Sequence, residues 1–289
     1  SIKIVRIDEA ELIRQLKIKP TNIAEWKKRH YITGYLNKNQ KVKIYVTREL
    51  KYKHDETLIN CDVPCIWKAK EIEDLTSEEL KSADGLLCVD QLGLPKEKAW
   101  KGQKFIQYTL EPETYFPQYH DKTNPYDIRA TYYENSDIPT SYVSMDTETW
   151  RSIVPFNITK LTPNSTFISF IASHWTQFRR EFIPNLEKHI PVASFGGVYR
   201  NTDWYPECPL ESKNCIISKF PFYLAIENCQ EKDYSTEKLW NTFNLGVVPV
   251  IWGAPNTRLY LPHPKSAIFI EDFKDAKALA DYLKYLVKK

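Results

Sequence analysis

Short runs of β-branched and aromatic residues recur along the chain, and they constrain its fold more than any other feature. Several of them are apolar without alternation, as expected of strands that are buried on both faces of a parallel sheet. The runs are IKIVRI, KVKIYV, GLLCVD, KFIQYTL, IRATYY, FISFIAS, PVASFGG, FYLAIEN, VVPVIWG and AIFIED. This pattern predicts buried strands from the first residues of the chain almost to its end.

Helical patterns lie between these runs. They are DEAELIRQL, LTSEELKSA with Thr76 as a predicted N-cap, QFRREFIPNLEKHI, STEKLWNTFNLG and DAKALADYLKYLVKK. Strands that alternate with helices predict parallel α/β sheets. The polar, proline-bearing segment 134–166 reads as a linker between two such units. We therefore expect one domain over residues 1–150 and a second over residues 151–289.

Composition and charge exclude some classes of protein. The formal net charge of +3 over 289 residues is too mild to indicate a nucleic-acid partner. No apolar run reaches the roughly 18 residues that a membrane span needs. The chain opens on a serine, so we expect that a membrane anchor, if the protein has one, lies outside this stretch. The segment CDVPC and the sequons at Asn157 and Asn164 favour an oxidising, secretory compartment.

A polar cluster follows the run FYLAIEN. Glu227 and Asn228 end this predicted strand, and the helix STEKLWNTFNLG begins a few residues later, capped by Ser235 or Asp233 and ended by Gly246. The cluster thus lies at the carboxyl end of a strand and in the first turn of a helix. Open α/β sheets bind ligands at that edge, and a helix N-terminus offers N–H groups to a phosphate.

The side chains of the cluster suit a nucleotide sugar. Lys238 can neutralise a diphosphate, and Glu237 can accept hydrogen bonds from two ribose hydroxyls. Tyr234 and Asn228 can donate to phosphate or sugar oxygens. The alternative is that Glu237 serves only the helix dipole and that Lys238 is solvated.

Four stretches of the chain resemble the α1,3/α1,4-fucosyltransferase family. FYLAIENCQEKDYSTEKLWNTFNLGVVPVIWG is similar to the family's donor motif. FISFIASHWTQFRREFIPNLEKHIPVASFGG and QKFIQYTLEPETYF are similar to two further segments, and CDVPC to a cysteine pair of animal-type members. The resemblance covers roughly residues 60–289. It implies a GT-B-like α/β fold of two Rossmann-like domains that face a cleft, with GDP-fucose in the second domain and the acceptor glycan in the first.

The resemblance also assigns roles to individual residues. The family's diphosphate-binding arginine falls on Arg179 and its acid beside the fucose on Glu227. Its other donor-binding residues fall on Asn228, Tyr234, Glu237 and Lys238, and its proposed general base falls on Glu111. Two assignments stay open, because Glu113 competes with Glu111 as the base and Arg180 adjoins Arg179.

The function implied by the resemblance is an inverting transfer of fucose from GDP-fucose to a hydroxyl of a GlcNAc-containing glycan or glycoprotein. No D-x-D motif occurs in the chain, and Arg179, Lys238 and the helix N-terminus can stabilise the leaving diphosphate, so we expect no metal and no other cofactor. We expect a location in the Golgi or another secretory-pathway lumen, although a soluble microbial or viral enzyme would also fit. The alternatives are a transferase of another nucleotide sugar and a non-catalytic glycan-binding relative.

Overall fold

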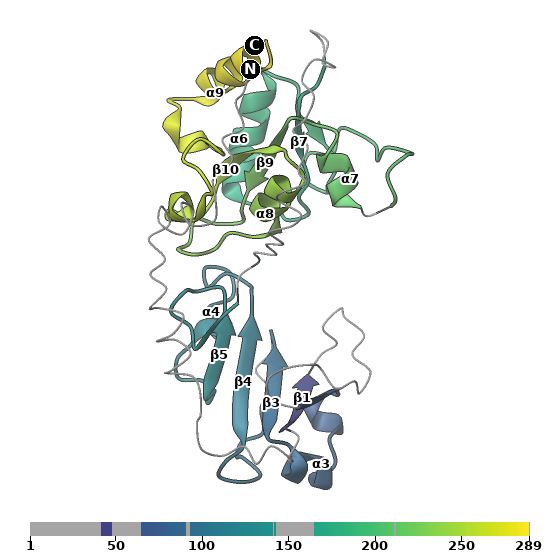
Figure 1. The fold of residues 1–289 in the computed structure, drawn as a ribbon, viewed down its shortest axis with the longest axis vertical. Coiled ribbons are helices and arrows are strands. Elements are labelled where there is room, and N and C mark those ends of the chain that lie inside the picture. The colour runs from purple at the N-terminus through teal and green to yellow at the C-terminus, as the bar shows by residue number, and fades with distance from the viewer. Residues whose placement is uncertain are drawn as a thin grey trace. The chain divides into compact units, whose positions relative to one another are not determined.

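The structure, a computed structural model, describes residues 42–47, 65–90, 93–140, 142, 165–210 and 212–288. These residues form two compact units, one from 42 to 140 and one from 142 to 288 (Figure 1). The predicted strand IKIVRI, the predicted helix DEAELIRQL and most of the predicted linker lie outside the described residues. So does the predicted domain boundary at residue 150, which stays a prediction.

The first unit contains a parallel sheet of six strands in the order β2-β1-β3-β4-β5-β6. The strands are β1 (Val42–Thr47), β2 (Cys65–Ala69), β3 (Gly85–Val89), β4 (Lys104–Thr109), β5 (Ile128–Thr131) and β6 (Ile138–Pro139). The helices are the 3₁₀ helix η1 (Ile72–Asp74), α3 (Ser77–Ser82) and α4 (Pro117–His120). The predicted cap of α3 is confirmed, because Thr76 and Glu79 form a reciprocal capping box.

The sheet of the first unit has apolar side chains on both faces. Tyr45, Leu86 and Phe105 pack on one face, and Val46 and Leu87 belong to a cluster on the other. This two-sided burial explains why apolar and polar residues do not alternate along the predicted strands.

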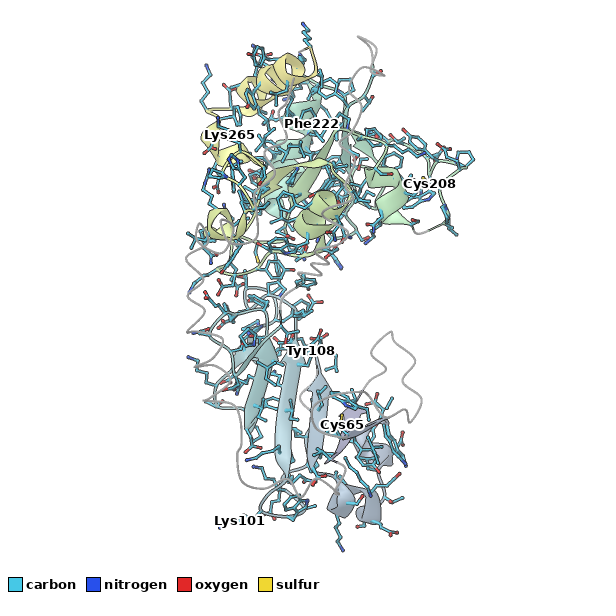
Figure 2. All side chains as sticks on the ribbon, in the orientation of Figure 1. Cys65, Lys101, Tyr108, Cys208, Phe222 and Lys265 are labelled. Atoms are coloured by element: carbon cyan, nitrogen blue, oxygen red, sulfur yellow. A yellow bond between two sulfur atoms is a disulfide. The ribbon has the colours of Figure 1, made fainter. Side chains whose placement is uncertain are left out.

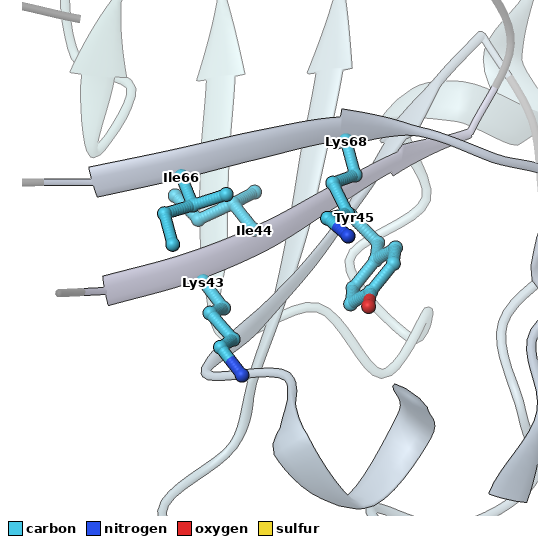
Figure 3. A pocket seen from close by; sticks show the side chains of 5 residues that line it. All are labelled: Lys43, Ile44, Tyr45, Ile66 and Lys68. Atoms are coloured by element: carbon cyan, nitrogen blue, oxygen red, sulfur yellow. The ribbon is translucent and has the colours of Figure 1, made fainter. Parts of the chain in front are cut away.

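A cavity of about 220 Å³ lies on the outer strands of this sheet, lined by Lys43, Ile44, Tyr45, Ile66 and Lys68 (Figure 3). Lys43 and Tyr45 share one side of β1, since side chains two apart on a strand point the same way. None of the predicted site residues lines this cavity.

The second unit contains a parallel sheet of five strands in the order β11-β10-β9-β7-β8. The strands are β7 (Ile168–Phe170), β8 (Ala193–Ser194), β9 (Phe222–Ile226), β10 (Val248–Trp252) and β11 (Ile268–Phe269). The helices are α6 (Gln177–Glu187), α7 (Lys213–Ile217), α8 (Glu237–Asn244), η3 (Thr257–Tyr260), η4 (Ile270–Asp272) and α9 (Ala276–Val287). Phe222, labelled in Figure 2, opens the central strand β9.

Helices cover both faces of the second sheet. Ile183 of α6 and Leu283 of α9 pack in one core cluster with Leu224 of β9. Ile216 of α7 and Leu239 of α8 belong to the cluster on the opposite face. The central strand β9 is consequently buried along its whole length, which its uninterrupted apolar sequence indicates.

The described residues include one disulfide. A disulfide joins Cys208 to Cys215, so α7 is tied to the loop that precedes it (Figure 2). Of the segment CDVPC, Cys61 lies outside the described residues, and Cys65 begins β2. Within the part of the chain that the structure describes, no helix is both long and apolar enough to cross a membrane.

Candidate active site

The carboxyl ends of β7, β9 and β10 lie at one edge of the second sheet, because neighbouring strands in the order β10-β9-β7 are parallel. Residues that follow these strands gather there. Glu227 and Asn228 follow β9, the loop into α6 follows β7, and Gly253 follows β10. This is the edge at which open α/β sheets bind ligands.

Glu227 is buried at this edge, with 3% of its surface exposed. One of its carboxylate oxygens accepts a hydrogen bond of 2.7 Å from the backbone N–H of Thr236, and the other accepts one of 2.8 Å from the Thr236 hydroxyl. Gly253 leaves room for this arrangement, since a Cβ there would come within 2.8 Å of Glu227 Cγ. The end of β9 is therefore fastened to the start of α8.

The N-cap of α8 is Thr236, so the prediction of Ser235 or Asp233 is wrong. The reason is tertiary: the Glu227 carboxylate holds both the N–H and the hydroxyl of Thr236. The Thr236 oxygen accepts in turn from the Lys238 N–H at 3.4 Å. The predicted left-handed residue after the helix is confirmed, because Gly246 has a φ of 67°.

Lys238 lies between two carboxylates. Its Nζ is 3.4 Å from Glu227 Oε2 and 3.3 Å from Glu237 Oε1, and it donates to the Thr236 hydroxyl at 3.0 Å. Only 14% of the Lys238 side chain is exposed. The ammonium is thus held in a fixed position beside the first turn of α8 rather than solvated.

Glu237 is ionised at neutral pH. Burial works to raise its pKa, but the Lys238 ammonium, the Thr236 hydroxyl and the charge of Lys213 outweigh that effect and lower it below the ordinary value. An ionised carboxylate is a pure hydrogen-bond acceptor. Glu237 therefore has the chemistry needed to accept hydroxyl groups of a sugar.

Arg179 is the largest fully buried side chain of the described residues, with 1% exposed. Its guanidinium donates to the carbonyl of His174 at 2.7 Å and to the carbonyl of Ile226 at 2.6 Å. Because Ile226 is the last residue of β9, Arg179 connects the loop after β7 to the strand end that carries Glu227. Its neighbour Arg180 is exposed and lies over the Trp175 ring, with 5.4 Å to the centroid.

The two remaining residues predicted to bind the donor nucleotide sugar differ in burial. Asn228 is half-buried directly after Glu227. Tyr234 is buried, and its ring packs edge-on against Tyr142 at 6.3 Å between centroids. The structure thus connects Arg179, Glu227, Glu237 and Lys238 into one group through Ile226 and Thr236, and it places Asn228 and Tyr234 on the segments that flank this group.

Glu111 belongs to the first unit, where it follows β4 at the carboxyl edge of that sheet. It is half-buried, and its backbone carbonyl is 2.8 Å from the His120 ring nitrogen. Glu113 is exposed, and its carboxylate accepts a hydrogen bond of 2.8 Å from the Tyr133 hydroxyl. The two acids therefore differ in environment, although the choice between them as a base stays a prediction.

Sequence reasoning missed the residues that hold this site together. They are Thr236, Gly253, Asn256, Thr257 and Tyr260. The signal for Gly253 was a glycine directly after a buried strand, which often marks a close approach of two segments. Thr236 is the N-cap of α8, and the other three residues lie at the start of η3 or within it. Only their tertiary partners distinguish these polar residues from solvated side chains.

Two α/β units, each built on a parallel sheet, define the class of fold, which is GT-B-like. The fold is shown by its similarity to a solved α1,3-fucosyltransferase structure described as containing GDP-fucose. The TM-score is 0.55 at 20% identity, over 91% of this chain and 83% of that one.

The family follows from sequence comparison. Residues 161–289 match the model of the carboxyl-terminal region of glycosyltransferase family 10 (fucosyltransferase). The chain is 32% identical over 205 residues to 4-galactosyl-N-acetylglucosaminide 3-alpha-L-fucosyltransferase 9 of Rattus norvegicus, which covers 69% of this chain and 54% of the relative. It is 40% identical over 116 residues to GDP-fucose protein O-fucosyltransferase 3 of Danio rerio, covering 38% and 25%. The chain spans about half the length, or less, of these curated relatives. Residues 161–289 therefore belong to the carboxyl-terminal region of glycosyltransferase family 10, the family that the sequence resembles.

Proposed function

We propose that this protein transfers fucose from GDP-fucose to a hydroxyl of a GlcNAc-containing glycan or glycoprotein, with inversion at the anomeric carbon. The observation that carries the proposal is the connected group of Arg179, Glu227, Glu237 and Lys238 at the start of α8, within residues that match the family model. Curated relatives of the chain are α1,3-fucosyltransferases and a protein O-fucosyltransferase by name, which supports fucose as the transferred sugar.

The donor diphosphate would bind at the first turn of α8. The N–H groups of that turn and the Lys238 ammonium offer positive charge at one place. Arg179 adds a guanidinium whose position is fixed by two backbone carbonyls. Glu237 would accept the ribose hydroxyls, and Asn228 and Tyr234 would donate to phosphate or sugar oxygens.

Departure of GDP requires stabilisation of the charge that develops on the diphosphate. Groups that are already in position before the reaction stabilise such charge without reorganisation. Arg179, Lys238 and the α8 N-terminus are of this kind, so we propose that the transfer needs no metal. Glu111 would take the proton of the acceptor hydroxyl as it attacks the sugar.

The proposed location is the lumen of the secretory pathway, with a membrane anchor outside this stretch. The disulfide between Cys208 and Cys215 supports an oxidising compartment. The sequons at Asn157 and Asn164 are consistent with it.

A transfer assay tests the proposal. The wild-type protein is incubated with a panel of GlcNAc-containing acceptors and either radiolabelled GDP-fucose or a radiolabelled UDP-sugar, with and without EDTA. We expect labelled product from GDP-fucose, at the same rate with and without EDTA. Transfer only from a UDP-sugar would favour the transferase of another nucleotide sugar. Glycan binding without turnover of any donor would favour the non-catalytic relative, and strict dependence on added manganese would contradict the metal-free mechanism.

Replacing Lys238 by methionine is expected to weaken GDP binding about 10- to 100-fold, because a charge-assisted contact of roughly 1.5–3 kcal/mol is lost while the side-chain length is kept. Isothermal titration with GDP measures the effect. Lys232→Met is the matched control, since Lys232 is an exposed lysine of the segment that precedes α8. Equal losses in the two variants would show that the contribution of Lys238 is only general surface charge.

A further inference from the structure

A second polar cluster lies beside the group of Arg179, Glu227, Glu237 and Lys238. It joins two segments at the same edge of the second sheet. It consists of Asp233, Asn256 and Tyr260. Asp233 comes from the segment before α8, whereas Asn256 and Tyr260 come from the segment that follows β10. None of the three is among the residues to which the family resemblance assigns a role in this chain.

Asp233 has a left-handed backbone conformation, with a φ of 65°. This conformation is uncommon for a residue other than glycine and persists only where the surroundings hold it. In this protein three hydrogen bonds hold Asp233 in that conformation. The Asp233 N–H donates to Asn256 Oδ1 at 2.9 Å, and Asp233 Oδ1 accepts from Asn256 Nδ2 at 2.6 Å and from the Tyr260 hydroxyl at 2.5 Å.

A further contact fastens the same two segments. The Ser235 and Thr257 hydroxyls are 3.2 Å apart, and the Thr257 hydroxyl donates to the carbonyl of Ala254 at 2.7 Å. Both hydroxyls are buried, so these bonds do not compete with water. The segment 233–236 is therefore tied at Asp233 and Ser235 to the segment 254–260.

The segment so held carries two residues of the donor site. Tyr234 is a predicted donor ligand, and Thr236 is the residue through which Glu227 and Lys238 are fixed. A loop with this conformation already imposed loses less entropy when a ligand binds to it. The contacts of Asp233 thus act on the segment that leads into the proposed diphosphate site.

We infer that Asp233, Asn256 and Tyr260 are positioning residues of the donor site, and that their hydrogen bonds set its affinity for the nucleotide. The inference rests on the proposed function. The three side chains shape the loop that meets the donor without supplying a group to the reacting atoms.

Tyr260→Phe tests the inference, because it removes one hydroxyl and keeps the ring. We expect the Kd for GDP and the KM for GDP-fucose to rise about three- to tenfold, which corresponds to the loss of one ordinary hydrogen bond. The KM for the acceptor and kcat should stay close to those of the wild type. Amide hydrogen exchange over residues 233–236 should become faster. Asp233→Asn, which keeps the shape and removes the charge, should show the same pattern.

Tyr282→Phe is the matched control, since this tyrosine lies on α9 of the same unit and is 40% exposed. It should bind GDP like the wild type. A lower unfolding temperature in Tyr260→Phe and Asp233→Asn with unchanged GDP affinity would overturn the inference, because it would make the cluster purely structural. If the wild-type protein itself fails to bind GDP, the proposed function fails, and the inference fails with it. If only the inference fails, the wild-type protein still binds GDP, so the two failures are distinguishable.

Discussion

Glu111→Gln is expected to lower kcat for fucose transfer about 1000-fold, within the range found when a general base is removed. The amide has nearly the shape of the carboxylate but cannot accept a proton from the attacking hydroxyl. Binding of GDP should stay unchanged, because the residues proposed to hold the nucleotide belong to the other compact unit. Steady-state kinetics and a GDP titration on the same preparation measure both quantities.

The control for this variant is Glu113→Gln. Glu113 is exposed and accepts a hydrogen bond from Tyr133, and its removal should change kcat less than about threefold. The acidic limb of the pH profile of kcat/KM, which reports the ionisation of the base in the free enzyme, should persist in Glu113→Gln and vanish in Glu111→Gln. The reverse pattern would assign the base to Glu113.

Arg179→Lys is expected to weaken donor binding about 100-fold, or ~2.7 kcal/mol. The guanidinium donates to the carbonyls of His174 and Ile226 from two nitrogens at once, and a single ammonium cannot reproduce that planar geometry. The free energy of unfolding should also fall, by about 2 kcal/mol, because a buried carbonyl is left without its donor.

Arg180→Lys provides the comparison for this variant. Arg180 is the next residue of α6 but is exposed, so its replacement should change donor affinity and stability only slightly. Calorimetric titration with GDP, together with thermal unfolding, separates the two arginines. A large loss of GDP affinity in Arg180→Lys with little change in Arg179→Lys would assign the diphosphate contact to Arg180 and leave Arg179 a structural role.

Much of the fold could be predicted from the sequence, because burial on both faces leaves a strong local pattern. Every predicted strand that falls within the described residues coincides with a strand of the structure. The strands that were missed, β2 and β6, lie at the two edges of the first sheet. Edge strands are only partly buried, and β6 has two residues, so neither carries the long apolar run that marks an interior strand.

Contacts between distant segments could not be predicted in the same way. Asp233, Ser235 and Thr236 are all good capping residues, and the sequence does not rank them. The choice of Thr236 depends on Glu227 and on the space left by Gly253, which belong to two other segments. Likewise, only the packing of α6 shows that Arg179 points inward and Arg180 outward.

The most direct measurement is a crystal structure of the protein soaked with GDP-fucose. We expect the diphosphate at the first turn of α8, within hydrogen-bond distance of Lys238 and close to Arg179, with the ribose against Glu237. Nucleotide bound elsewhere on the protein, with the start of α8 unchanged and unoccupied, would contradict this expectation.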